Sequence, residues 1–76
     1  MTVNADYEKA LGQNIRRLRM QRKLSQEQVA AQLQVRGCDV TRSALAKIEV
    51  GQRHIYPDEL MQLRAILGVS YEDLFV

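Results

Sequence analysis

The 76-residue chain carries a formal net charge of +2, with 46% hydrophobic and 26% charged residues. This composition is typical of one small globular domain and excludes a disordered chain or a two-domain protein. No apolar run approaches the roughly 20 residues of a membrane span, and the first residues lack the features of a signal peptide. One cysteine and one histidine exclude an internal disulfide and a cysteine–histidine zinc site. We expect a single cytoplasmic domain over residues 1–76, without metal or cofactor.

The charge is unevenly distributed along the chain. Residues 9–53 contain ten Lys or Arg and three acidic residues, a net charge of +7. Residues 54–76 carry a net −3, and residues 1–8 a further −2. Such segregation favours a polyanion-binding side in the first part of the molecule. The alternative is an ordinary set of solvated helix faces.

Two helices are predicted in the first half of the chain. A capping box of Ser25 and Gln28 opens the second of them, over residues 26–35, because each side chain can satisfy an unpaired backbone donor. Gly37 is expected to end it in a left-handed conformation. The first helix, over residues 6–22, is marked by apolar residues at helical spacing: Tyr7, Leu11, Ile15 and Leu18.

Three further helices are predicted in the second half. Thr41 is a suitable N-cap for a helix over residues 42–50. A fourth helix over residues 57–67 begins with proline, which suits a first helical position, and Ser70 caps a short helix over residues 71–75. Since no segment alternates with period two, we expect an all-α fold of five helices without a sheet.

The predicted helix over residues 42–50 has an apolar face and a polar face. At 100° per residue, Arg42, Ser43 and Lys47 fall together on the polar side. The DNA major groove admits one helix, and its base edges offer acceptors that Arg, Lys and Ser can bind. This pattern is typical of a recognition helix, although many surface helices carry one Arg and one Lys.

Four sequence blocks, in order, strengthen that interpretation over residues 6–75. They are Leu11-Gly12-x-x-Ile15-Arg16-x-Leu18-Arg19, Leu24-Ser25-Gln26-Glu27-Gln28-Val29-Ala30, Thr41-Arg42-Ser43-x-Leu45-x-x-Ile48-Glu49-x-Gly51 and Leu67-Gly68-Val69-Ser70-x-x-x-Leu74-Phe75. Together they resemble the lambda-repressor-like, or xenobiotic-response-element, family of helix-turn-helix regulators. The resemblance implies a five-helix domain that binds double-stranded DNA sequence-specifically, as a transcriptional repressor, with its third helix in the major groove.

The resemblance also implies roles for eight residues. Arg19 and Glu49 occupy the positions of a partly buried ion pair that ties the first helix to the third. The base-reading positions are those of Arg42, Ser43 and Lys47. The positions that contact the DNA backbone are those of Gln26, Thr41 and Arg53.

Two segments depart from the family pattern. The turn over residues 34–39 is longer than usual, which leaves the angle between the two helices open. It brings Arg36 either to a phosphate or simply into solvent. In the loop before Pro57, Tyr56 and His54 could donate to phosphate, while the alternative for Tyr56 is packing against the fourth helix.

The same residues argue against other classes of function. No Ser, Cys or acidic residue lies at a spacing that would pair recognisably with His54, so we expect no enzyme. Cys38 is expected in a polar turn beside Arg36, and two alternatives follow: Arg36 lowers the pKa of the thiol and makes it a redox sensor, or Cys38 is a bystander thiol. An antitoxin-like or other protein-interaction module remains the main alternative, although no toxin-binding tail follows the last helix. We expect no small-molecule effector.

The cluster of Tyr71, Leu74, Phe75 and Val76 is either a homodimer face on the C-terminal helices or the lid of the core.

Overall fold

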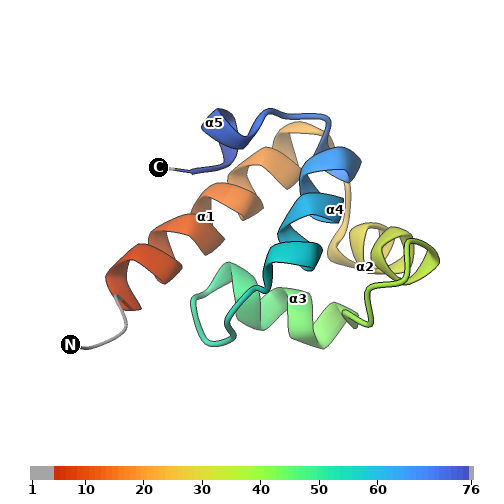
Figure 1. Cartoon of the computed structure of the whole chain (residues 1–76), viewed down its shortest axis with the longest axis horizontal. Helices are drawn as coiled ribbons and strands as arrows, with labels where there is room; N and C mark the ends of the chain where they lie inside the picture. The colour runs from red at the N-terminus through yellow and green to blue at the C-terminus, as the bar shows by residue number, and fades with distance from the viewer. Residues whose placement is uncertain (1–4, 76) are drawn as a thin grey trace.

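The computed structural model describes residues 5–75 and is built from helices alone over that range (Figure 1). The five helices predicted from the sequence are confirmed. The first spans residues 5–21, one residue earlier at each end than expected, and the third and fifth each end one residue early. The observed elements are α1 (Ala5–Gln21), α2 (Gln26–Val35), α3 (Arg42–Glu49), α4 (Pro57–Leu67) and α5 (Tyr71–Leu74).

The helices surround one hydrophobic core. Helix α1 packs against α3 and α5, while α2 contacts both α3 and α4. In Figure 1, α3 and α5 lie at opposite ends of the view. Apart from Glu49, the most deeply buried large side chains are aliphatic and come from all five helices and the α2–α3 turn: Ile15, Val29, Leu33, Val40, Leu45, Leu63, Leu67 and Leu74.

Side-chain caps determine where three of the helices begin. The Ser25 hydroxyl accepts from the Gln28 backbone N–H at 3.0 Å, and the Gln28 side chain accepts from the Ser25 N–H at 2.8 Å. Thr41 Oγ1 accepts from the Ala44 N–H at 3.1 Å, and Ser70 caps α5 in the same way. The first four N–H groups of a helix have no partner within it, so these caps fix the start of α2, α3 and α5.

The lengthened turn between α2 and α3 folds inwards. Gly37 adopts φ +88°, a left-handed conformation that favours glycine. Val40 is then fully buried, and Arg36 Nη1 donates to Gln62 Oε1 of α4 at 3.2 Å. The extra residues therefore connect the turn to α4 while α2 and α3 remain in contact.

The expectation that Cys38 lies in a polar turn is wrong, and the redox-sensor alternative, which needs a lowered thiol pKa, is not supported; the other alternative, a bystander thiol, agrees with the structure. Its side chain is part of the hydrophobic core, and its sulfur lies 4.0 Å from the Asp58 carbonyl oxygen. Burial raises the pKa of the Cys38 thiol, and the negative charges of Asp58 and Glu59 raise it further. A thiol held protonated in the core has the wrong environment for a reactive redox sensor.

Helix α5 is tied to α1 by one buried side chain. The Asn14 amide nitrogen donates to the carbonyl oxygens of Asp73 and Leu74, at 2.8 Å and 2.6 Å. Leu74 is buried, so it belongs to the lid of the core, whereas Tyr71 and Phe75 remain largely exposed. Val76 lies outside the described residues.

Candidate nucleic-acid interface

Helix α3 presents its polar face to solvent. The three residues predicted to read bases, Arg42, Ser43 and Lys47, are all exposed. Leu45 and Ile48 on the opposite side are buried in the core. The structure thus places all three candidate residues on the accessible side of the helix, with Arg42 and Ser43 in its first turn and Lys47 in its last.

A polar hollow lies beside this face. Its volume is about 430 Å³, and it is lined by parts of α1, the start of α2 and the start of α3: Arg16, Arg19, Ser25, Gln26, Glu27 and Arg42. Arg16 was not among the predicted site residues, although it lies opposite the apolar stripe of the first helix. Arg16 and Arg42 bring positive charge next to the start of α2, where a helix dipole favours an anion, whereas Arg19 is already paired and Glu27 adds a negative charge.

Arg19, which lines this hollow, forms an ion pair with Glu49. Arg19 Nε donates to Glu49 Oε2 at 2.7 Å, and Arg19 Nη2 donates to Oε1 at 3.0 Å. The third arginine nitrogen donates to the Leu24 carbonyl oxygen at 2.8 Å. Only 1% of the Glu49 side chain is exposed, so the pair joins α1 to α3 within the protein.

Gln26 is held in the same cluster. Its side-chain nitrogen donates to Glu49 Oε1 at 3.0 Å. The predicted backbone-contacting residue therefore has a fixed orientation at the first position of α2, next to the hollow. Thr41 lies one residue before the first position of α3, where its hydroxyl caps the helix.

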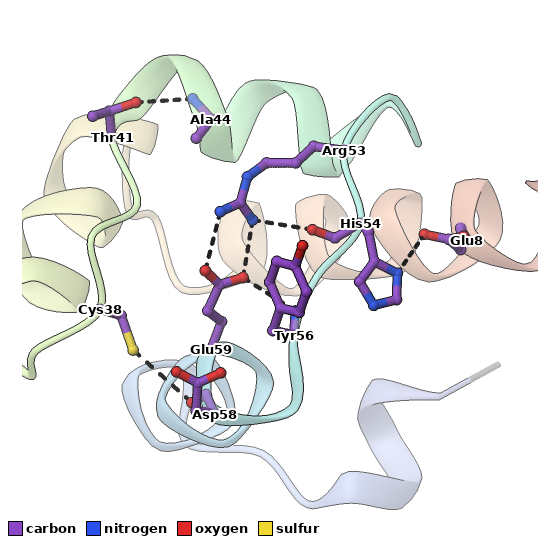
Figure 2. A network of polar contacts seen from close by, with 9 residues as sticks. All are labelled: Glu8, Cys38, Thr41, Ala44, Arg53, His54, Tyr56, Asp58 and Glu59. Atoms are coloured by element: carbon purple, nitrogen blue, oxygen red, sulfur yellow. Dashed lines mark hydrogen bonds and ion pairs between the residues drawn. The ribbon is translucent and has the colours of Figure 1, made fainter.

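Arg53, the third residue predicted to contact the DNA backbone, already has a carboxylate partner (Figure 2). Its Nη1 donates to Glu59 Oε1 at 2.9 Å and its Nη2 to Oε2 at 3.0 Å. Nη1 also donates to the His54 carbonyl oxygen at 3.0 Å. Glu59 lies in the first turn of the fourth helix, where acidic residues are favoured, and the sequence indicated nothing more about it. That it pairs with Arg53 across the loop could not be inferred from any local sequence pattern.

Glu59 is ionised and well connected. Its Oε1 also accepts from the Tyr56 backbone N–H at 3.1 Å, which caps the start of α4. The hydrogen bonds from Arg53 lower the pKa of the Glu59 carboxyl, and their effect exceeds that of burial, which raises it. The same hydrogen bonds raise the pKa of Arg53.

The loop before α4 carries a second, more exposed polar contact. His54 Nδ1 lies 3.1 Å from Glu8 Oε1 of α1, and the centroids of the His54 and Tyr56 rings lie 5.0 Å apart with the rings nearly perpendicular. Tyr56 itself is largely exposed. Below the loop lies an apolar groove of about 340 Å³, lined mainly by Tyr7, Leu11, Ile55, Pro57, Leu60 and Phe75.

Within residues 5–75, no group of three or more His, Cys, Asp or Glu side chains is placed to hold a metal ion. No helix in that range is both long and apolar enough to cross a membrane.

Comparison with known proteins agrees with this geometry. A family model described as "Helix-turn-helix" matches residues 15–74. The restriction-modification controller protein C.AhdI from Aeromonas hydrophila superposes with a TM-score of 0.83 at 28% identity, over 97% of this chain and 100% of that one. The DNA-binding domain of BldD gives 0.81 at 27% identity, over the same shares. No curated protein sequence matches the chain significantly.

Proposed function

Because the chain belongs to the lambda-repressor-like helix-turn-helix family, we propose that it is a transcriptional regulator that binds double-stranded DNA sequence-specifically. The observation that carries this proposal is the exposed face of Arg42, Ser43 and Lys47 on α3, next to the arginine-lined hollow at the start of α2. The protein acts in the cytoplasm by binding, without catalysis, and represses transcription by occupying its operator.

In the proposed complex, α3 lies in the major groove. Arg42 and Lys47 donate to acceptors on guanine, and Ser43 binds a neighbouring base edge. Gln26, Thr41 and Arg53 contact phosphates on either side of the groove and so fix the position of α3. Phosphate neutralisation supplies much of the affinity, which therefore falls steeply as salt concentration rises.

Selection of binding sites from a random DNA pool tests this function directly. An enriched motif is expected for the wild type, and Arg42→Ala should lose preference at one base position, at a cost of about 1–3 kcal/mol. Arg53→Ala is the matched control, because loss of a phosphate contact weakens all sequences alike. An unchanged motif in Arg42→Ala would remove Arg42 from base reading. A complete lack of enrichment with wild-type protein would favour the protein-interaction module.

We also propose a homodimer through the C-terminal helices. Tyr71 and Phe75 are exposed there, and α5 lies at the other end of the molecule from α3 in Figure 1, so a second copy would leave both recognition helices free. Two half-sites would then lie about 34–36 Å apart on the DNA. Sedimentation should show a dimer that Phe75→Asp converts to monomer while its helical content is retained. A Phe75→Asp protein that remains dimeric would place the interface elsewhere.

A further inference from the structure

Arg53 uses only one of its two donor edges. A guanidinium has five N–H groups in a rigid fork, and it can bind an oxyanion through its end, by Nη1 and Nη2, or through its side, by Nε and Nη2. Arg19 binds Glu49 through its side edge. Arg53 binds Glu59 through its end edge instead. Within residues 5–75, the Nε of Arg53 has no hydrogen-bond partner, so its side edge is available.

The Glu59 carboxylate keeps Arg53 in place. Only 11% of the Glu59 side chain is exposed, against 27% for Arg53. Glu59 is further held by the Tyr56 backbone N–H, and hydrogen bonding from Arg53 lowers the pKa of its carboxyl. If Arg53 turned away to meet a ligand, an ionised and mostly buried carboxylate would lose its counter-charge, which is strongly unfavourable. A phosphate that approaches Arg53 therefore meets an arginine that is still paired.

The charge of this pair differs from that of the other basic residues on the proposed interface. Arg42 and Lys47 form no ion pair within the described residues, so each brings a full positive charge to DNA. Arg53 and Glu59 together are neutral. A neutral donor pair can hydrogen-bond to a phosphate, but it does not displace a condensed counterion as a free cation does.

We propose that Glu59 limits the affinity of the DNA interface by holding Arg53 in a neutral pair that presents only its side edge to one phosphate. The inference rests on the proposed DNA-binding function, with Arg53 at a backbone phosphate. Glu59 acts as a positioning residue in this scheme. It orients the guanidinium of Arg53, and it reduces by one the number of unpaired cationic side chains that can neutralise DNA phosphates.

The test is the salt dependence of DNA binding by Glu59→Gln, measured by fluorescence anisotropy between 50 and 200 mM salt, about the range over which such slopes are commonly compared. The glutamine oxygen can still accept from Tyr56, but the negative charge is gone. The slope of log K against log salt should become steeper by about 0.9, with affinity up to about eightfold higher near 0.1 M salt. Arg53→Gln should make the slope shallower, and the double variant Arg53→Gln/Glu59→Gln should restore the wild-type slope.

Two controls separate this inference from simpler explanations. Asp58 is exposed and lies next to Glu59 in the sequence, so Asp58→Asn removes the same charge without breaking the Arg53 pair. The slope of log K against log salt should change much less in Asp58→Asn than in Glu59→Gln. Thermal unfolding of each variant gives the folded fraction used to calculate affinity. An unchanged slope in Glu59→Gln, weaker binding with a shallower slope, or an equal change in Asp58→Asn would each overturn the inference.

Failure of the proposed function gives a different result. In that case wild-type protein shows no enriched motif. If a motif is enriched and Arg42→Ala loses preference at one base position while Glu59→Gln leaves the salt slope unchanged, the DNA-binding function stands and the role of Glu59 is excluded.

Discussion

Helix α3 is flanked by two arginine–glutamate pairs in very different surroundings. At the junction with α1, Arg19 meets Glu49 through its side edge, and Glu49 is 1% exposed. At the junction with α4, Arg53 meets Glu59 through its end edge, with 27% and 11% of the two side chains exposed. The first pair can only serve the fold, since both its partners and its edges are occupied within the protein. The second pair stabilises the loop and still presents donors to the outside.

The comparison teaches that one type of pair can have two functions according to its burial and geometry. Water screens the Arg53 pair in part, so its contribution to stability is modest, and the exposed part of Arg53 can be reached by a ligand. The Arg19 pair is screened much less, and breaking it leaves a buried charge. The following changes separate the two junctions, beginning with the largest expected effect.

Arg19→Ala should have the largest effect, because it leaves Glu49 ionised and buried without its partner. The expected loss is about 3–5 kcal/mol in the free energy of unfolding. A domain of this size has a net stability of about 3–5 kcal/mol, so much of the variant would be unfolded at 25 °C. Urea titration followed by circular dichroism measures the loss. Arg16→Ala, an exposed arginine on the same helix, is the control and should change stability little. An unchanged melting temperature for Arg19→Ala would contradict the architectural role.

Gly12→Ala tests the same junction by packing instead of charge. A Cβ at this position would collide with the Ile48 carbonyl oxygen and lie 3.0 Å from the Glu49 carbonyl carbon. In a free helix, alanine would be favoured over glycine by about 1 kcal/mol. Here we expect a loss of about 1–3 kcal/mol, because both helices must move apart. The sign of the change in the free energy of unfolding decides whether packing or helix propensity dominates at Gly12. A stabilised variant would show that α1 and α3 are not tightly apposed.

The sequence predicted the α1–α3 junction far better than the α3–α4 junction. Gly12, Arg19 and Glu49 lie within family blocks, and the apolar periodicity of the first and third helices indicated which faces meet. The Arg53–Glu59 pair was missed because it depends on the path of the loop between α3 and α4, which no periodic pattern describes. The same cause explains why the burial of Cys38 was missed: a long turn with polar neighbours folds its thiol into the core.

The proposed site was predictable in its residue types and less so in its arrangement. The helical wheel placed Arg42, Ser43 and Lys47 on one face, and the structure has all three exposed. Gln26 was assigned a DNA contact, but its hydrogen bond to Glu49 could not be inferred, since it requires knowing how α2 crosses α3. Asn14, which holds α5, was overlooked because a polar residue within an amphipathic helix is most often at the surface.

A smaller effect is expected from Glu59→Gln on stability, and it should depend on pH. The folded-state pKa of Glu59 is lowered from an ordinary value of 4.5. The carboxylate therefore stabilises the fold above that value, and this stabilisation is lost as the pH falls through the lower folded-state pKa. At pH 7 the variant should be less stable by about 1 kcal/mol, since the pair is partly exposed. The difference between the two proteins in urea titrations should shrink below about pH 4.5. A difference that is constant from pH 7 to about pH 3 would mean that the lost charge is not its source.

The smallest effect is expected at the third polar contact, between His54 and Glu8. His54 Nδ1 and Glu8 Oε1 lie 3.1 Å apart, but 59% of the His54 side chain is exposed. Exposed ion pairs usually contribute about 0–1 kcal/mol, since water screens them and both side chains lose conformational freedom. His54→Ala should therefore change the free energy of unfolding by less than about 0.5 kcal/mol at pH 7. Glu8→Gln gives a second measure of the same contact and should agree within error. A loss comparable to that of Arg19→Ala would show that distance, and not burial, determines what these pairs contribute, and the contrast between the two junctions of α3 would then fail.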